Sequence, residues 1–294
     1  MTRAERSAVL TISLAILAAA GVAAAVSQGG ASVIGLPLFA CVIALAFLIQ
    51  WATFVPAYVM QSERFFDITG SITFVAVTGV AVGLSPAIDA RSVLLLCLVG
   101  TWAIRLGTFL LWRVHKVGKD ARFDEIKISF SRFLMTWTLQ GLWVSLTLAT
   151  ALAAITSTVR VSLDNFAWVG LALWLVGFGI EALADVQKSR FRSDLDNKGN
   201  FIQTGLWSWS RHPNYFGEIL LWTGVAVIAL PVLRHWQWVS IISPVFVTLL
   251  LTRISGVPML ERRADEKWGG QEAYEVYKKR TSILIPWPPR RSQS

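Results

Sequence analysis

The sequence predicts an all-α membrane protein, a multi-span bundle of about seven or eight transmembrane helices. Of its 294 residues, 54% are hydrophobic and only 15% are charged, a balance that soluble globular domains rarely show. The apolar residues form runs long enough to cross a bilayer, and the polar residues gather in the connections between these runs. These observations place the chain among integral membrane proteins.

The apolar runs define eight candidate spans. In chain order they are 8–26, 33–60, 70–87, 93–112, 133–155, 166–184, 215–233 and 236–251, followed by a polar tail over 262–294. The small residues that end the first run are also compatible with a signal-peptide cleavage region, but we favour a retained helix. The sequence shows no internal repeat and no low-complexity linker, so a single integral membrane domain over 1–294 is predicted.

Lysine and arginine are distributed unevenly between the connections. The two termini and the connections after the second, fourth and sixth spans hold 22 of the 27, whereas the opposite connections hold three, Arg91, Arg160 and Arg234. Short cytoplasmic loops are enriched in these residues. The asymmetry predicts that both termini and every long polar loop face the cytoplasm, most simply from the inner membrane of a bacterium.

The net charge of +9 is explained without nucleic acid, because the basic residues lie between apolar runs and form no separate basic domain. Membrane lipids and an anionic ligand are the expected partners. The two cysteines, Cys41 and Cys97, lie inside apolar runs without CxxC spacing. Neither a disulfide framework nor a metal site is predicted.

The polar break between the sixth and seventh spans is the main candidate site. Glu181 and Asp185 are four residues apart and project from one helix face, and Lys188, Arg190 and Arg192 follow within two turns. Carboxylates suit ribose hydroxyls and guanidinium groups suit phosphates, so this mixed patch fits a nucleotide. The alternative is an interfacial helix end with snorkelling cations.

Residues 194–204 have the Asp, Asn and Gly content of a turn, with Lys198 as a further cation. The sequence then reads Arg211-His212-Pro213-Asn214-Tyr215, and Pro213 suits the first turn of the seventh helix. The N–H groups of that helix start, beside Arg211, offer an anion site. For His212 the alternative is a hydrogen-bonded structural histidine.

Two charged residues lie within the last apolar helices. Glu218 follows Asn214 by one turn, and Arg253 closes the last span. A charge at membrane depth requires a partner. For Arg253 the internal candidates are Glu218, Asp185 and Glu181, and the external candidate is a ligand phosphate. By contrast, the pattern GxGxxA at Gly177 lacks a preceding strand, so close helix packing explains it better than dinucleotide binding.

A second acidic pair, Glu63 and Asp67, lies between the second and third spans on the predicted cytoplasmic side. We expect Asp67 to be the proton donor near a bound substrate, with Glu63 as runner-up and Tyr58 assisting. The alternative is that Asp67 only caps the third helix.

Three segments carry a family resemblance: TGLWSWSRHPNYFGEILLW, LLLTRISGVPMLE and YEVYKKRTSILIPW. They resemble membrane-embedded reductases typified by steroid 5-alpha-reductase and the sterol reductases, and most closely the bacterial DUF1295 family. The resemblance covers roughly residues 60–288. It implies NADPH as cofactor, bound at the cytoplasmic side. The contacts that it implies are Glu181, Asp185, Arg192, Asn214, Glu218 and Arg253.

The steroid enzymes of this group use a Gln-Glu pair and a Tyr to polarise the substrate carbonyl. In this chain the Tyr position falls at Trp102, which cannot deliver an acidic proton, and the Gln-Glu pair has no clear counterpart.

The leading hypothesis is an NADPH-dependent reductase of a C=C bond, most simply an enone, in a lipophilic substrate. The alternatives are an S-adenosylmethionine-dependent lipid methyltransferase, like the isoprenylcysteine carboxyl methyltransferases, and a non-catalytic lipid-binding protein. The sequence predicts no oligomeric state.

Overall fold

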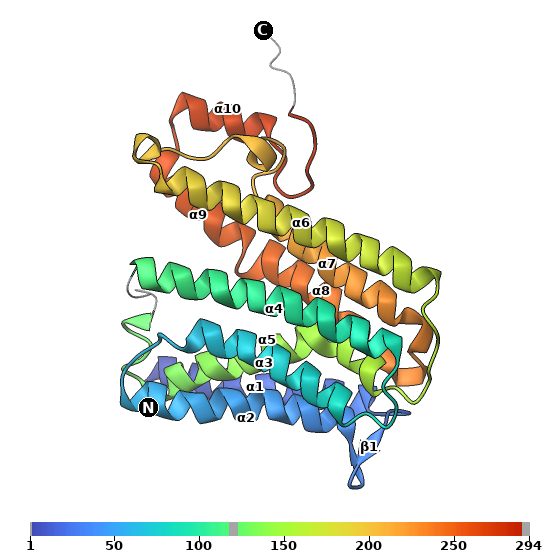
Figure 1. Cartoon of the computed structure of the whole chain (residues 1–294). Coiled ribbons are helices and arrows are strands. Elements are labelled where there is room, and N and C mark those ends of the chain that lie inside the picture. The colour runs from blue at the N-terminus through green and yellow to red at the C-terminus, as the bar shows by residue number, and fades with distance from the viewer. Residues whose placement is uncertain (1, 118–122, 290–294) are drawn as a thin grey trace. The chain divides into compact units, whose positions relative to one another are not determined.

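The computed structural model describes the backbone of residues 2–117 and 123–289 and the side chains of 2–111 and 123–289. Within these residues, eight helices are long and apolar enough to cross a membrane. The predicted fold class, a multi-span helical bundle, is therefore confirmed (Figure 1).

The α-helices are α1 (Arg3–Val26), α2 (Leu38–Val59), α3 (Phe66–Gly83), α4 (Ala90–Val117), α5 (Phe130–Thr156), α6 (Asn165–Ser193), α7 (Pro213–Ala229), α8 (Ile242–Leu249), α9 (Val257–Trp268) and α10 (Glu272–Arg280). The shorter elements are strands β1 (Ser32–Val33) and β2 (Leu36–Pro37), the 3₁₀ helices η2 (Leu195–Asn197), η3 (Gly205–Ser208), η4 (Leu230–Val232) and η5 (His235–Ile241), and the π-helix η6 (Leu250–Ile254). The two strands pair antiparallel, with Ser32 opposite Pro37.

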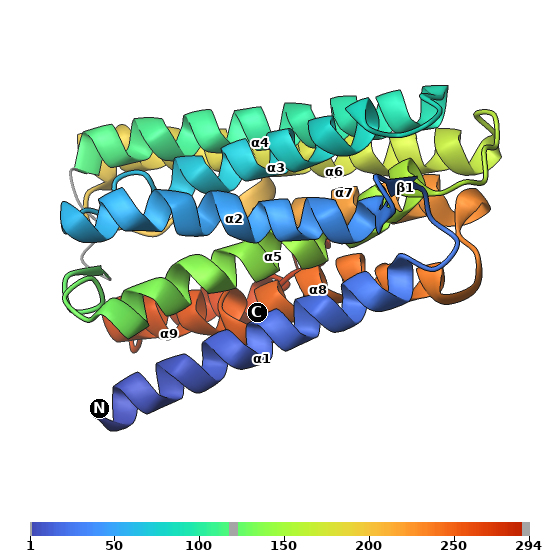
Figure 2. The ribbon, with the colours of Figure 1, turned by 90° about the horizontal axis from the view of Figure 1, so that it is seen from below.

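The described chain divides into two compact units, Met1–Trp168 with Ile228–Ser243, and Val169–Val227 with Pro244–Ser294. In the first unit α5 packs against α1, α2 and α3 (Figure 2), and its second half is buried throughout. That half consists of small and aliphatic residues, which allow neighbouring helices to approach closely. Some of its hydroxyls donate within the helix, as Thr156 does to the Leu152 carbonyl at 2.8 Å, whereas Thr150 donates to the Ser240 carbonyl at 2.6 Å.

Arginine side chains tie down the loops at one end of the first unit. Arg91, almost fully buried, donates to the Ser162 carbonyl at 2.9 Å, to the Asp164 carboxylate at 3.0 Å and to the Ile228 carbonyl. Arg160 donates to the Ser85 hydroxyl at 2.7 Å. Buried loop carbonyls need donors, and the guanidinium group supplies several from one residue.

In the second unit, glycines bring α6 and α7 into close contact. A β-carbon placed on Gly177 would lie 2.6 Å from the Gly217 carbonyl oxygen, and one on Gly224 would lie 2.5 Å from that of Gly170. These distances exclude a larger side chain without helix displacement. The predicted packing role of Gly177 is confirmed.

Each predicted span overlaps one of the candidate membrane helices, but several ends differ. Residues 32–37 form the β1–β2 hairpin, with positive φ at Ile34 and Gly35, so α2 begins at Leu38 rather than at 33. The helix α6 continues to Ser193, beyond the predicted end at 184, because a helix need not stop where its apolar residues do. The last apolar run extends as a succession of η5, α8, η6 and α9.

Candidate functional site

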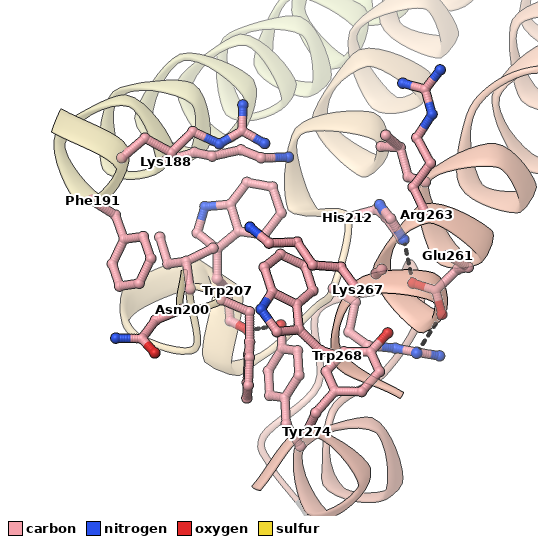
Figure 3. Close-up of a pocket in the computed structure, with 17 residues that line it drawn as sticks. Lys188, Phe191, Asn200, Trp207, His212, Glu261, Arg263, Lys267, Trp268 and Tyr274 are labelled. Carbon is pink, nitrogen blue, oxygen red and sulfur yellow. Dashed lines mark hydrogen bonds and ion pairs between the residues drawn. The ribbon is translucent and has the colours of Figure 1, made fainter. Parts of the chain in front are cut away.

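Four segments of the second unit surround a cavity of about 320 Å³. They are the end of α6, the loop from 194 to 212, α9 and α10, whose side chains converge in Figure 3. Local sequence sets up the loop: Asp194 caps η2 by accepting from the Asp196 N–H at 3.1 Å, and Gly205 adopts φ +61°. This positive φ favours glycine, and a β-carbon at Gly205 would in addition displace the Gln187 side chain of α6, 2.6 Å away.

Glu261 of α9 connects the two first residues of the Arg-His-Pro-Asn-Tyr motif. One carboxylate oxygen accepts from Arg211, and the other lies 2.7 Å from Nε2 of His212 (Figure 3). Tyr215 stacks on the His212 ring at 5.8 Å between centroids. The motif is therefore fixed from two sides, by an acid on α9 and by an aromatic ring on α7.

Burial lowers the pKa of His212, and this effect exceeds the opposite effect of its hydrogen bond to Glu261. The imidazole is consequently neutral near pH 7. A carboxylate only accepts hydrogen bonds, so Nε2 carries the proton and Nδ1 is an acceptor. Within the described residues that Nδ1 has no hydrogen-bond partner, and neither has Nε of Arg211. Both atoms are buried hydrogen-bonding groups of residues that line the cavity.

Aromatic side chains form one wall of the cavity. The Phe201 ring lies 5.8, 5.3 and 5.4 Å from the rings of Trp268, Tyr274 and Tyr277. Tyr277 donates to the Trp207 carbonyl at 2.7 Å. Burial raises the pKa of both tyrosines well above its usual value, so their hydroxyls stay protonated. Planar rings of this kind suit stacking against a flat ligand.

Cations dominate the electrostatics of the cavity. In the described lining, five residues are basic and Glu261 is the one acid; the basic residues are Lys188, Arg192, Arg211, Arg263 and Lys267. The Lys188 ammonium lies 4.5 Å from the Trp207 ring centroid, and that of Lys267 lies 4.5 Å from the Trp268 ring. A cleft with this charge balance attracts anions.

The carboxylates of the α6 patch lie next to α7. Asn214 donates from Nδ2 to Asp185 at 3.3 Å, and its Oδ1 has no partner within the described residues. Glu181 is almost fully buried, and its backbone approaches Gly217. The close glycine contact therefore brings the two polar helix ends together.

The predicted cofactor residues thus fall into groups. Lys188, Arg192, Arg211 and His212 line the cavity. Glu181, Asp185, Asn214, Tyr215 and Glu218 lie on α6 and α7 outside its lining. The remaining cations, Arg190, Lys198 and Arg253, are exposed and do not line it. Arg253 lies in the π-helix η6, and π-helical turns of this kind are frequent at functional sites.

Sequence reasoning did not assign the α9 and α10 side of the cavity. Glu261, Arg263 and Lys267 come from α9, and the aromatic wall combines Phe201 with Trp268 and the two tyrosines. The amphipathic composition of the tail was the available signal. That composition indicates a helix with a polar face, but it does not indicate which residues that face contacts.

The predicted catalytic residues lie in the first unit. Glu63 is buried and ion-paired with Lys127 at 3.0 Å, which raises the pKa of that lysine. Asp67 is partly buried in the first turn of α3, whose N-cap is Phe65 rather than Asp67. Tyr58 stacks on Phe54 within an aromatic cluster.

These features define a class: a multi-span helical membrane protein with a cation-rich, aromatic cavity beside one of its helix ends. The chain belongs to the family described as protein of unknown function DUF1295, whose model matches residues 53–281.

Individual relatives are similar over part of their length. The chain is 30% identical over 140 residues to the uncharacterized protein C594.04c of Schizosaccharomyces pombe, covering 40% of this chain and 38% of that protein. It is 30% identical over 119 residues to 3-oxo-5-alpha-steroid 4-dehydrogenase 1 of Rattus norvegicus, covering 40% of each, and similarly to that of Mus musculus. The chain therefore spans well under half the length of these relatives. No solved structure gives a significant match.

Proposed function

We propose that the protein is an NADPH-dependent membrane reductase that transfers hydride to a C=C bond, most simply that of an enone, in a lipophilic substrate. The observation that carries the proposal is the cavity, whose described lining sets five cations and an aromatic wall against one acid. Such a lining favours a ligand with several phosphates and a flat ring. S-adenosylmethionine has a cationic sulfonium and no phosphate, so the methyltransferase alternative is disfavoured by charge.

The residues present fit this cofactor. A cavity of about 320 Å³ is at the small end of ligand sites, which span roughly 300–1,000 Å³, and matches a nucleoside phosphate. We assign the phosphorylated adenosine end to it, with Arg192, Arg211, Arg263 and Lys267 as phosphate partners. The unpartnered acceptor of His212 suits a ribose hydroxyl.

The remaining cofactor groups are assigned to the polar ends of α6 and α7. Asp185 orients Asn214 by accepting its amide, which leaves Asn214 Oδ1 as an acceptor. Glu181 and Glu218 supply further acceptors, and Arg253 a cation. The bound cofactor supplies hydride, and the protein supplies orientation and a proton.

Similarity to a 3-oxo-5-alpha-steroid 4-dehydrogenase supports the reaction class. That name describes an enzyme that acts on a 3-oxo steroid at position 4. In the reductive direction, the substrate of such a reaction is a steroid whose C=C bond at position 4 is conjugated with the 3-oxo group, an enone. We propose that Asp67 of this chain donates the proton after hydride delivery. Trp102 is buried against Phe74, with ring centroids 5.0 Å apart, so it packs rather than donates to a substrate.

Titration of the purified protein in detergent tests the proposal. NADPH is expected to bind about tenfold or more tightly than NADH, because an extra phosphate meets cations that the bridging phosphates do not use. Arg263→Gln is expected to reduce this preference, whereas Asn214→Ala and Glu218→Ala weaken both nucleotides alike. Equal affinity for NADPH and NADH would remove the argument for a phosphorylated ribose, and tighter binding of S-adenosylmethionine would favour the methyltransferase.

A further inference from the structure

The segment after α10 presents apolar side chains to the outside in a regular pattern. Residues 282–287, here named the C-terminal strap, expose Ile283, Ile285 and Trp287 by 50%, 61% and 69%. The intervening residues are half-buried. The strap bends at residues 283–285 and still turns these three side chains outward while the residues between them pack inward.

The strap is held in place, so this exposure is a fixed feature. The Arg211 N–H donates to the Ser282 carbonyl at 2.8 Å, and the Ser210 hydroxyl donates to that of Leu284 at 2.7 Å. At the other end the Trp287 N–H donates to the Trp209 carbonyl at 3.1 Å. The strap therefore adds a backbone pairing to the loop of the candidate site.

The same contacts place the strap near the residue of α6 at which the apolar run of that helix ends. Trp207, two residues before the partner of Trp287, donates from its indole to the Ala184 carbonyl at 3.1 Å. The apolar run of α6 ends at Ala184. Trp209 is itself 46% exposed. Tryptophans gather at the boundary between hydrocarbon and headgroups, which is the expected depth of this surface.

The sequence of the strap and its flanking residues is basic. Residues 278–294 contain five basic residues and no acidic residue. Lys278, Lys279 and Arg280 form the last turn of α10, directly before the strap. Lys278 is occupied by Asp265 at 2.6 Å, whereas Lys279 is exposed. Basic residues beside exposed apolar side chains are the combination that binds anionic lipid surfaces.

We propose that the C-terminal strap docks on the anionic phospholipid surface of the membrane that the chain spans, with Ile283, Ile285 and Trp287 in the headgroup boundary. The cations at the end of α10 select acidic headgroups. The strap side chains do not line the cavity, so the proposal does not depend on which cofactor the cavity takes.

The test uses the full chain with Cys41→Ala and Cys97→Ala, reconstituted in phosphatidylcholine vesicles with or without phosphatidylglycerol. A fluorescent label at Ile285→Cys is compared with one at Gln271→Cys, an exposed residue at the start of α10. Quenching by a lipid with a headgroup-level nitroxide is expected to be about twofold or more stronger at 285, and stronger in anionic than in neutral vesicles. Lys279→Gln with Arg280→Gln should weaken the dependence on anionic lipid.

Equal quenching at the two positions would overturn the proposal. So would protection of the 285 label from both the lipid nitroxide and aqueous acrylamide, which would indicate cover by a second copy or another protein. Equal quenching in neutral and anionic vesicles would overturn the choice of an acidic surface.

Discussion

Glu261 holds Arg211 and His212 through its two carboxylate oxygens, and this pairing fixes the orientation and the tautomer of the His212 ring. Glu261 is partly buried, so loss of either partner would leave its charge less well compensated. Burial keeps His212 neutral against the opposite effect of Glu261, and Glu261 holds the ring in place with the proton on Nε2. The structural histidine and the ligand-binding histidine, which the sequence offered as alternatives, are compatible.

The pH dependence of stability is expected to reveal His212. Its pKa in the folded protein lies below the ordinary value of 6.5 because of burial. A group with a lowered folded pKa contributes stability that is fully present above pH 6.5 and is lost as the pH falls through the folded pKa. The melting temperature in detergent should therefore fall more steeply from pH 7.5 to 5.5 in the wild type than in His212→Gln. At pH 7.5 the variant should lose about 1–3 kcal/mol. Parallel pH profiles would contradict this assignment.

Asp67→Asn separates a catalytic acid from a structural one. Asp67 lies in the first turn of α3, where a carboxylate also interacts favourably with the helix dipole, a contribution of about 0.3–1 kcal/mol. If it donates the proton, the variant should bind NADPH normally but reduce an enone lipid about 10²–10⁴-fold more slowly. The readout is oxidation of NADPH at saturating cofactor.

Glu63→Gln is the matched control for Asp67→Asn. It removes the buried partner of Lys127, so it should lower thermal stability more than it lowers turnover per folded molecule. An Asp67→Asn enzyme with wild-type turnover would rule out the assigned acid.

At the scale of elements, the close contact between α6 and α7 places the polar residues at the end of α6 next to those at the start of α7. Gly224→Ala would place a β-carbon 2.5 Å from the Gly170 carbonyl oxygen, so the helices must separate. The expected loss is about 1–3 kcal/mol of stability, together with weaker nucleotide binding. Gly179→Ala on α6 is the control, because no atom lies within 4 Å of its β-carbon. Equal thermal stabilities of the two variants in detergent would show that the contact is not tight.

At the scale of the whole molecule, charge predicts orientation. The three basic residues of the sparsely charged connections, Arg91, Arg160 and Arg234, all donate to backbone carbonyls in loops or at helix ends. Their presence thus has a structural reason, and the remaining asymmetry favours a cytoplasmic location for both termini. A fluorescent protein fused at the C-terminus should fluoresce, and alkaline phosphatase inserted after Thr158 should be active. The reverse pattern would invert the topology.

The sequence by itself predicted the apolar spans and the polar stretch that contributes one side of the candidate site. Hydropathy is a local property, so eight apolar runs predicted eight membrane-capable helices in the described chain, and Pro213 marked the start of α7. The polar break between two apolar runs located the Arg-His-Pro-Asn-Tyr motif in the same way. Local rules failed at some ends: the β1–β2 hairpin replaced the start of a span, and α6 continued past its apolar residues.

Only the tertiary structure decided which side chains meet. Glu261 is 49 residues from His212, and Phe201 is 67 residues from Trp268, so no helical or turn spacing relates them. Their contacts depend on the face that α9 and α10 turn toward the loop, and packing between helices sets that face. In the same way, small residues on α6 and α7 signalled close packing, but the partner helix became known only when Gly177 was found against Gly217. Periodicity fixes which residues share a face, whereas the shape of the neighbouring surface selects what that face contacts.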